Sequence, residues 1–330
     1  MSLKVTIKPA NASGRAPQVA KGLPVTLEFP GKTAQTLRVD EVKKALAAKF
    51  PRFTIYRQKL SLPNAKPALA DEKTVAEVVF DANKGAELAK TGGEAAEVEL
   101  WVKDLGPQIS WQTVFVIEYI GPLFIHPLIY HLPKVFFRSD FQHSRLQQLV
   151  YALVLAHYVK RELETLFVHR FSHATMPARN IVKNSAHYWI LSGLFLAGAV
   201  YGPWYSAPRL NGTLFNSDKW LLGWGALFVV SELFNLSAHL TLRALRPAGT
   251  KTRGIPRGGL FELVTCPNYF AETMAWVAIT AVTASPIVAI FLVVSVGQMV
   301  IWAAKKHRAY KKEFGDKYPR GRKVMFPFIW

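Results

Sequence analysis

Beyond residue 105 the chain is dominated by long apolar runs, most of them close to the ~20 residues that a helix needs to cross a bilayer. The fifth run is shorter than the others. Tryptophans stand near the ends of several runs, where an aromatic belt at the membrane surface would place them. The pattern predicts six membrane-spanning helices, at about Trp111–Leu132, Leu146–Val168, His187–Tyr205, Trp220–Leu242, Tyr269–Ala284 and Pro286–Ala304.

The first hundred residues follow a different pattern. Apolar and polar residues alternate over Leu3–Lys8 and Pro24–Phe29, as they do in half-buried strands. Asp40 is the expected N-cap of a helix that ends at Lys49, before Pro51. Further short segments follow at Phe53–Leu62 (strand), Thr74–Val79 and Val98–Val102 (strand). The order β-β-α-β-…-β resembles a ubiquitin-like β-grasp domain, for which we expect a docking or stabilising role.

These two patterns divide the chain into a small α+β domain over residues 1–105 and an α-helical multi-pass membrane domain over residues 106–330. No signal-peptide-like apolar core precedes the first domain, so we expect it to stay in the cytosol. The single cysteine, Cys266, excludes an internal disulfide framework and argues against a Cys-based zinc site. We expect no bound metal.

Charge sets the expected orientation. The net charge is +19 although half of the residues are hydrophobic, and the basic residues lie in loops between apolar runs. That placement favours membrane anchoring over a nucleic-acid-binding face. With both termini cytosolic, the cytoplasmic side carries most of the loop charges, which are Lys160, Arg161, Arg170, Arg179, Lys183, Arg243, Arg246, Lys251, Arg253 and Arg257, and a basic tail from Lys305.

Ionisable side chains interrupt several predicted spans, where they are costly unless they face a protein interior or a watery cavity. Glu118 lies within the first span and needs a partner or a proton; the alternative to function is a structural hydrogen bond. The second span ends in a dense polar group that includes Tyr158, Lys160 and Glu164. Lys160 and Glu164 stand four residues apart and can pair. A charged collar at the membrane interface is the alternative for this group.

A polar stripe runs along the fourth span. Its members are spaced by three or four residues and so share one helical face: Glu232, Asn235, His239, Arg243 and Arg246. The two arginines suit a phosphate group, because guanidinium binds phosphate through two parallel hydrogen bonds. A polar seam between helices is the alternative.

The last two spans add further candidates. Asn268 and Glu272 share one face at the start of the fifth helix, and Tyr269 beside them is a candidate proton donor. The alternative for Asn268 is an N-cap. The sixth helix continues past the membrane with Lys306 and Tyr310, where attraction to anionic lipid is the alternative. No Gly-rich dinucleotide fingerprint or P-loop is present, so a nucleotide would bind between helices at the cytoplasmic face.

Several spaced motifs together resemble the C-terminal domain of the steroid 5α-reductase family: Gly258-Gly259-Leu260-Phe261, Cys266-Pro267-Asn268-Tyr269-Phe270-Ala271-Glu272, His307-Arg308-Ala309-Tyr310, Phe314, Tyr318-Pro319 and Arg322-Lys323-Val324-Met325-Phe326-Pro327-Phe328. Within that family the chain is most similar to the very-long-chain trans-2-enoyl-CoA reductases. The ubiquitin-like region, the segment from His157 to His169 and the Cys-Pro-Asn-Tyr motif carry this closer resemblance.

The resemblance implies NADPH as hydride donor, an endoplasmic reticulum membrane and the last step of very-long-chain fatty acid elongation, in company with other elongation enzymes. It suggests cofactor contacts at Asn235, His239, Arg246, Asn268, Glu272, Lys306 and Tyr310. Two of these depart from the steroid enzymes, which have aspartate at the position of His239 and tend to have histidine at the position of Lys306. Glu118 and Tyr158 correspond to the pair that the steroid enzymes place on the substrate carbonyl.

The mechanistic hypothesis follows from these roles. Hydride addition to Cβ of a long-chain trans-2-enoyl-CoA develops negative charge on the thioester oxygen, which Tyr158, oriented by Glu118, stabilises by hydrogen bonding. Tyr269 then protonates Cα as general acid, although the two tyrosines can exchange roles. Lys160 lowers the pKa of a nearby tyrosine or holds Glu164. The acyl chain lies among the apolar helices of the membrane.

Three other functions remain open from the residues alone. The first is a reductase of a 3-oxo-4-ene steroid or a polyprenol. The second is a membrane S-adenosylmethionine-dependent methyltransferase, although the Arg-His-Pro-x-Tyr-x-Gly pattern of that class is absent. The third is a non-catalytic scaffold, which the cost of so many ionisable groups on the predicted spans argues against.

Overall fold

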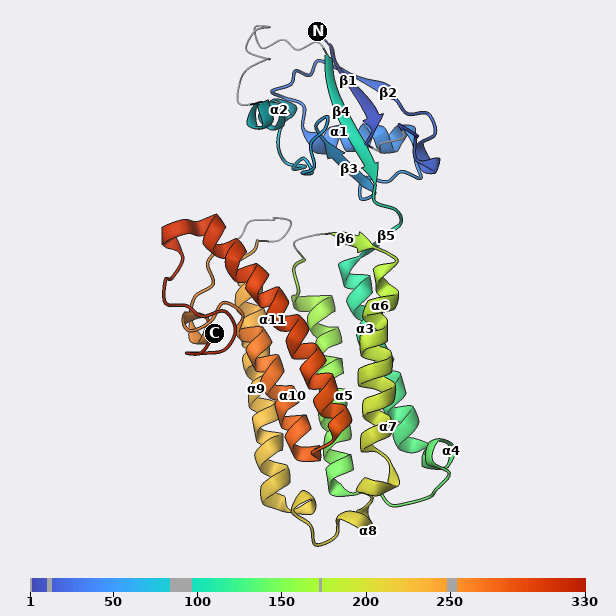
Figure 1. The fold of residues 1–330 in the computed structure, drawn as a ribbon, viewed down its shortest axis with the longest axis vertical. Coiled ribbons are helices and arrows are strands. Elements are labelled where there is room, and N and C mark those ends of the chain that lie inside the picture. Colours follow the sequence, from blue (N-terminus) through green and yellow to red (C-terminus); the bar gives the residue numbers. More distant parts are fainter. Residues whose placement is uncertain (1, 11–13, 84–96, 172–173, 248–253) are drawn as a thin grey trace. The chain divides into compact units, whose positions relative to one another are not determined.

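The computed structural model describes residues 2–10, 14–83, 97–171, 174–247 and 254–330 (Figure 1). Its internal contacts divide the chain into two units. Unit 1 comprises Met1–Ser110 with Ala174–Arg179, and unit 2 comprises Trp111–His173 with Asn180–Trp330. Two of the expected cytoplasmic charges, Lys251 and Arg253, lie outside the described residues.

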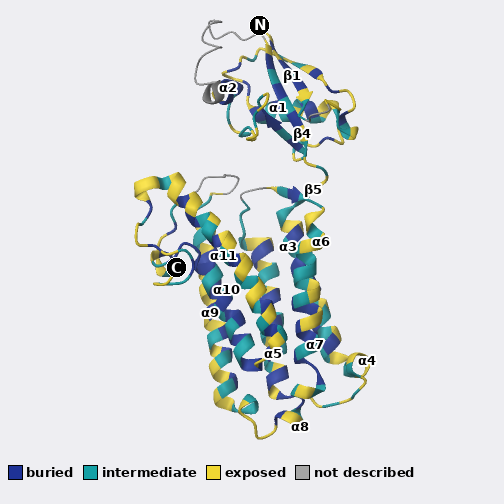
Figure 2. Cartoon of the chain, viewed as in Figure 1, coloured by how far each residue is buried: buried dark blue, intermediate teal, exposed yellow. Residues whose placement is uncertain are grey.

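Unit 1 is built on a four-stranded mixed sheet. The strands occur in the order β2-β1-β4-β3, with bounds β1 (Ser2–Pro9), β2 (Val25–Pro30), β3 (Gln58–Ser61) and β4 (Glu97–Asp104). The two central strands, β1 and β4, run parallel, while both outer pairings are antiparallel. Alternate residues of β1 and β4 are buried, as a sheet with one covered face requires (Figure 2). They share one core with α1 (Val39–Lys49), of which Val42 and Leu46 are fully buried.

The alternating segments expected near the N-terminus are strands, and the expected helix is present. The predicted N-cap was wrong. Helix α1 begins at Val39 after an extended Arg38, whose backbone N–H donates to Glu41 Oε2 at 3.0 Å. The carboxylate of Asp40 instead accepts from Lys44 Nζ at 2.9 Å, one turn along the helix. The short segment expected at Thr74–Val79 coincides with the start of a helix, α2 (Val75–Asn83). Identification of this unit as ubiquitin-like stays a prediction.

Unit 1 also holds a second, two-stranded sheet. It pairs β5 (Gln108–Ser110) with β6 (Thr175–Pro177) in antiparallel fashion. Strand β6 follows the second long helix of the chain, yet the contacts of the segment Ala174–Arg179 that contains it assign this segment to unit 1. The predicted division of the chain at residue 105 does not include this segment in the first domain.

Unit 2 is a bundle of long helices (Figure 1). Its principal helices are α3 (Trp111–His131), α5 (Arg145–Leu163), α9 (Asp218–Ala244), α10 (Pro267–Thr283) and α11 (Pro286–Phe314). Two wider π-helical segments extend or interrupt this set: η3 (Glu164–Val168) continues α5, and η4 (His187–Phe195) lies between the short helices α6 (Asn180–Ala186) and α7 (Leu196–Val200). Short elements in the connections are α4 (Pro133–Phe137), α8 (Ala207–Leu210) and η7 (Gly259–Glu262).

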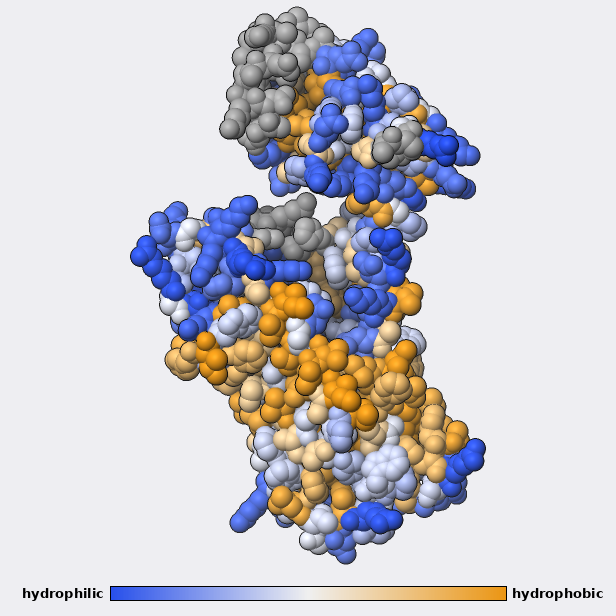
Figure 3. Space-filling model, in the orientation of Figure 1, coloured by the Kyte–Doolittle hydropathy of each residue, from blue (hydrophilic) through white to orange (hydrophobic). Residues whose placement is uncertain are grey.

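Within the part of the chain that the structure describes, three helices are long and apolar enough to cross a membrane by length and composition: α3, α9 and the segment Pro286–Lys317 that contains α11. The other three predicted spans coincide with α5, α6–η4–α7 and α10. Helix α5 carries Lys160 and Arg161 in its last turn, and α10 has only 17 residues. On the face drawn in Figure 3, a hydrophobic band covers the middle of unit 2 and hydrophilic residues gather at its ends. The chain is therefore a helical membrane protein, and the count of six spans stays a prediction.

Candidate functional site

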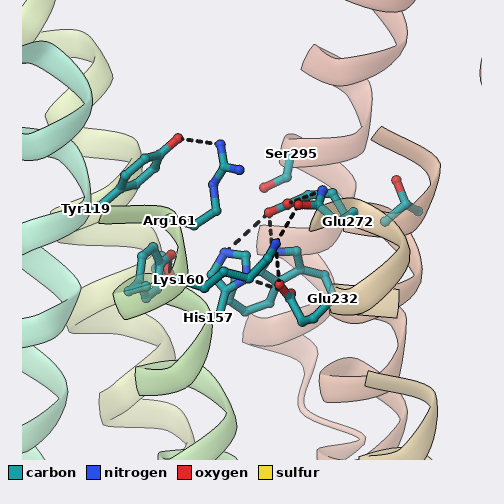
Figure 4. Close-up of polar contacts among 12 residues, drawn as sticks. Tyr119, His157, Lys160, Arg161, Glu232, Glu272 and Ser295 are labelled. Carbon is teal, nitrogen blue, oxygen red and sulfur yellow. Dashed lines mark hydrogen bonds and ion pairs between the residues drawn. The ribbon is translucent and has the colours of Figure 1, made fainter. Parts of the chain in front are cut away.

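A cluster of charged side chains lies inside unit 2, where α5, α9 and α10 meet (Figure 4). Lys160 Nζ from α5 is 2.9 Å from Glu232 Oε2 of α9 and 3.1 Å from Glu164 Oε1. It also donates to Asn235 Oδ1 at 2.6 Å. One ammonium group thus donates a hydrogen bond to an amide oxygen and forms ion pairs with two carboxylates.

The neighbouring imidazole of His157 lies between Glu232 and a third carboxyl group, that of Glu272. His157 Nδ1 is 2.8 Å from Glu232 Oε1, and its Nε2 is 3.3 Å from Glu272 Oε1 of α10. The imidazole of His157 therefore lies between carboxylates of α9 and α10, and Lys160 and Arg161 place positive charge beside the buried carboxylates.

A second part of the cluster is centred on the guanidinium of Arg161. Its Nη1 donates to Glu164 Oε2 at 2.6 Å, and its Nη2 donates to the hydroxyl of Tyr119 on α3 at 2.9 Å. The other oxygen of Glu164 is 3.1 Å from His239 Nδ1 of α9. Glu164 begins the π-helical segment η3, and π turns are frequent at functional sites. The carboxylate of Glu164 therefore contacts α9 through His239 and is linked to α3 through Arg161 and Tyr119.

Helical periodicity explains why these side chains meet. His157 and Lys160 of α5 and Glu164 at the start of η3 are spaced by three and four residues, as are Glu232, Asn235 and His239 on α9. On α10, Glu272 accepts from the indole of Trp276 at 3.3 Å and from Asn235 Nδ2 at 3.2 Å. The same amide also donates to the backbone carbonyl of Asn268 at 2.9 Å. The polar faces of α5, α9 and α10 are therefore turned toward one another.

Glu164 and His239, together with His169 just after η3, also have the spacing of a metal site. Ligand atoms of Glu164, His169 and His239 lie within 4.8 Å of one another. Burial and the nearby Arg161 lower the pKa of His169 to about 3, so its ring is neutral at physiological pH. However, Lys160 and Arg161 already contact the same carboxylate. Two cations at this distance would repel a divalent ion, so we assign the three groups to the ion-pair cluster.

Glu118 and Tyr158, expected to act as a pair, have different partners in the described residues. The Tyr158 hydroxyl lies 2.5 Å from the hydroxyl of Ser192 on η4. Glu118 is buried in α3, and its side-chain partner is Asn184 of α6. The expected orientation of Tyr158 by Glu118 is therefore not seen, because the first turns of α6 supply another partner for the carboxylate.

The remaining candidates gather near the first turn of α10. Tyr269 packs against a small core of Cys266, Met299, Ala303 and Met325, and Lys306 of α11 interacts electrostatically with it. The same ammonium lies 5.9 Å from the ring centre of Tyr310. The C-terminal segment closes this region, since the backbone of Cys266 donates to the Val324 carbonyl at 3.1 Å.

Arg246 at the end of α9 has its own contact. Its Nη1 donates to the Arg170 carbonyl at 2.6 Å, and Arg170 donates in turn to the Arg243 carbonyl at 3.3 Å. Its expected phosphate contact is not tested by these hydrogen bonds.

Several residues of the cluster were not among the predicted site residues: Tyr119, His157, Arg161, Ser192, Glu232 and Trp276. Two of them had a detectable signal, since His157 and Glu232 continue the polar stripes of their helices. The sequence places Arg161 among the charges expected on the cytoplasmic side, and its contact with Tyr119 joins two helices, α5 and α3, that no local pattern pairs. Ser192 had no signal, because a lone serine in an apolar run is ordinary.

The sequence of this chain is similar to those of several known reductases. The family model described as 3-oxo-5-alpha-steroid 4-dehydrogenase matches residues 174–330. A very-long-chain enoyl-CoA reductase of Dictyostelium discoideum is 40% identical over 303 residues, which cover 90% of this chain and 93% of that protein. A candidate enoyl reductase of Schizosaccharomyces pombe is 50% identical over 70% of this chain and 76% of its own length. A candidate very-long-chain enoyl-CoA reductase of Caenorhabditis elegans is 38% identical over 88% and 91% of the two chains.

Proposed function

Because this chain belongs to the very-long-chain enoyl-CoA reductases of the steroid 5α-reductase family, we propose that it reduces a long-chain trans-2-enoyl-CoA with NADPH, as the last step of very-long-chain fatty acid elongation. The observation that carries the proposal is the buried ion-pair cluster around Lys160, to which α5, α9 and α10 contribute. Buried ionisable groups in a membrane are expensive and mark functional sites. The near-complete coverage of the Dictyostelium protein supports the same activity for the whole chain.

The residues present fit a nicotinamide cofactor. The side-chain oxygen of Asn268 is buried and has no hydrogen-bond partner in the described chain, although Asn235 and Glu272 lie beside it. An unpaired buried acceptor is costly and suits an amide donor such as the carboxamide of nicotinamide. We propose that Asn235, His239, Asn268 and Glu272 hold that end and that Arg246, Lys306 and Tyr310 hold the phosphate-bearing end. The bound cofactor supplies a hydride to Cβ of the substrate.

The chain's own residues perform the rest of the chemistry. The Tyr158 hydroxyl donates a hydrogen bond to the thioester oxygen, on which negative charge develops. The phenolic proton of Tyr269 moves to Cα, so one hydride and one proton saturate the double bond. The ammonium of Lys306 interacts with Tyr269 and stabilises the phenolate that remains until solvent returns a proton. Lys160 and Glu164 hold the cluster that orients these groups.

Placement in the cell completes the proposal. We propose six membrane spans, an endoplasmic reticulum membrane and cytosolic termini, since the loop charges follow the positive-inside pattern. The N-terminal unit is proposed as a ubiquitin-like cytosolic domain. Contacts with membrane lipid and with other elongation enzymes belong to the same proposal.

NADPH oxidation by the detergent-purified chain tests the activity, with a long trans-2-enoyl-CoA and, separately, a 3-oxo-4-ene steroid as substrates. We expect turnover of the enoyl-CoA alone. Turnover of the steroid alone would overturn the substrate, and this second candidate is worth testing because the matching family model is described by a steroid reaction. Absence of NADPH oxidation with both would overturn the proposed reaction.

A further inference from the structure

We propose that Ser192 is a positioning residue, which donates a hydrogen bond to the Tyr158 oxygen and so directs the phenolic hydrogen of Tyr158 toward the substrate. This inference rests on the proposed function of Tyr158. Both side chains are fully buried, and their hydroxyl oxygens lie 2.5 Å apart. They come from α5 and from the π-helical segment η4, so tertiary packing alone brings them together.

A count of hydrogens shows why this pair points to a ligand. Two hydroxyl groups carry two hydrogens, and the bond between them uses one. In the described chain neither hydroxyl has another hydrogen-bond partner. One hydrogen is therefore left without an acceptor at a fully buried place, which is costly unless a ligand supplies the acceptor. If Ser192 is the donor, that free hydrogen belongs to Tyr158.

Ser192 differs from several other hydroxyl residues of the helices in the partner of its hydrogen bond. Serine and threonine within helices commonly donate to the carbonyl four residues earlier. The bundle has several such bonds, made by Thr165, Ser231, Thr241, Thr273 and Thr280. The hydroxyl of Ser192 instead points out of its own helix to α5. The wide turn of η4 changes the direction of this side chain, in keeping with the occurrence of π turns at functional sites.

The wide turn is held in place by α3. His126 Nε2 is 3.1 Å from the Ser192 carbonyl, and its Nδ1 is 2.8 Å from the Tyr201 hydroxyl. A carbonyl only accepts, so the hydrogen is on Nε2, and Tyr201 donates to Nδ1. A Cβ added at Gly193 would lie 2.9 Å from Ile125 Cδ1 of α3. The close contact at Gly193 and the bond from His126 together fix the turn that carries Ser192.

The direction of the bond has a measurable consequence. If Ser192 donates, its removal lets the Tyr158 hydroxyl rotate and weakens stabilisation of the thioester oxygen. If Tyr158 donates, removal of Ser192 frees the phenolic hydrogen and leaves turnover unchanged or raised. Only the first direction makes Ser192 useful to the reaction.

The test is a double-mutant cycle on the detergent-purified full chain, with enoyl-CoA turnover and NADPH affinity as readouts. The variants are Ser192→Ala, Tyr158→Phe and the two together, with Ser231→Ala as matched control because Ser231 is also buried but bonds within its own helix. Ser192→Thr, which keeps the hydroxyl, is the conservative variant.

We expect Ser192→Ala to lower kcat on the order of tenfold, the effect of one lost hydrogen bond, with KM and NADPH affinity unchanged. Ser192→Thr is expected to recover most of that loss, and Ser231→Ala to match the parent chain. In the Tyr158→Phe background, Ser192→Ala is expected to have no further effect, because the serine acts through the phenol.

Two results would overturn the role of Ser192: unchanged or raised kcat in Ser192→Ala, or an equal loss in the presence and absence of the Tyr158 hydroxyl. A Tyr158→Phe chain that turns over like the parent chain would instead overturn the role of Tyr158. If the parent chain itself does not turn over enoyl-CoA, the proposed function is overturned. The three failures are therefore distinguishable.

Discussion

At the scale of single residues, the central feature is a set of charges that stay buried because each has a partner. Lys160 contacts Glu164 and Glu232, and Arg161 contacts Glu164. Such pairs add little net stability compared with apolar packing, but removal of one member leaves an uncompensated charge. Their presence in a membrane bundle is therefore better explained by chemistry than by stability.

Replacement of Lys160 tests this balance. Lys160→Met keeps the length of the side chain but leaves Glu232 and Glu164 with one cationic partner fewer. We expect a loss of stability on the order of 3 kcal/mol, seen as a lower thermal midpoint, together with loss of turnover. Lys160→Arg keeps the charge and should retain more of the stability. A Lys160→Met chain as stable as the parent would show that the ammonium is not needed to offset the carboxylates.

The proposed general acid gives a second prediction. Tyr269→Phe removes one hydroxyl and leaves the ring that packs against Cys266 and Met299. We expect turnover to fall by about 10²-fold, within the range for loss of general acid catalysis, while NADPH affinity changes little. Fluorescence titration with NADPH and steady-state turnover measure the two effects. Turnover close to that of the parent chain would remove Tyr269 from the chemistry.

At the scale of secondary-structure elements, unit 1 has an ion pair with a defined pH dependence. Arg57 donates to Asp104 through Nε at 3.0 Å and Nη2 at 2.6 Å, which joins the turn before β3 to the end of β4. Burial by itself raises the pKa of Asp104, but hydrogen bonds from Arg57 and the Gly106 amide leave the pKa below its ordinary value of 3.8. The folded state therefore favours the ionised carboxylate.

The sign of the effect follows from linkage. A pKa lowered by folding contributes stability at neutral pH, and this contribution is lost as pH falls from the ordinary value through the lowered one. We expect hydrogen-exchange protection of β3 and β4 to fall over that range. Asp104→Asn should cost about 1 kcal/mol at neutral pH and abolish this part of the pH dependence. Equal acid sensitivity in the variant would assign the effect to another group.

At the scale of the whole molecule, all of the proposed site residues belong to unit 2. They come from α3, α5, η3, η4, α9 and the residues just after it, α10 and α11, and none comes from the sheets of unit 1. The apolar surface band on those helices fits a bilayer (Figure 3). The chemistry is thus expected to need the bundle alone.

Deletion of residues 1–105 tests that expectation. The shortened, detergent-purified chain should keep most of its turnover of enoyl-CoA with NADPH, because the ion-pair cluster and the proposed acid are intact. A chain that elutes as a folded particle in gel filtration but has lost turnover would show that unit 1 contributes to catalysis. Turnover per folded molecule is therefore the quantity to compare with the parent chain.

Much of this protein follows from local sequence pattern. The alternation in Leu3–Lys8 predicts β1, and the apolar runs predict α3, α9 and α11, because burial of side chains has the period of the backbone that carries them. The spacing of Lys160 and Glu164 likewise predicts their ion pair, which forms at 3.1 Å. Residue spacing determines which side chains share one face of a helix, and this spacing can be read from the residues of that helix alone.

Only the tertiary structure decided which faces meet. It paired Tyr158 with Ser192 and Glu118 with Asn184, where sequence reasoning paired Tyr158 with Glu118. It also joined Lys160 to Glu232, which is 72 residues away in the chain. The rotation and crossing of helices depend on packing between elements, and π turns such as η4 redirect side chains without a local signal. Contacts within one element can therefore be predicted from the residues of that element. Contacts between elements depend on how the helices pack in the folded bundle.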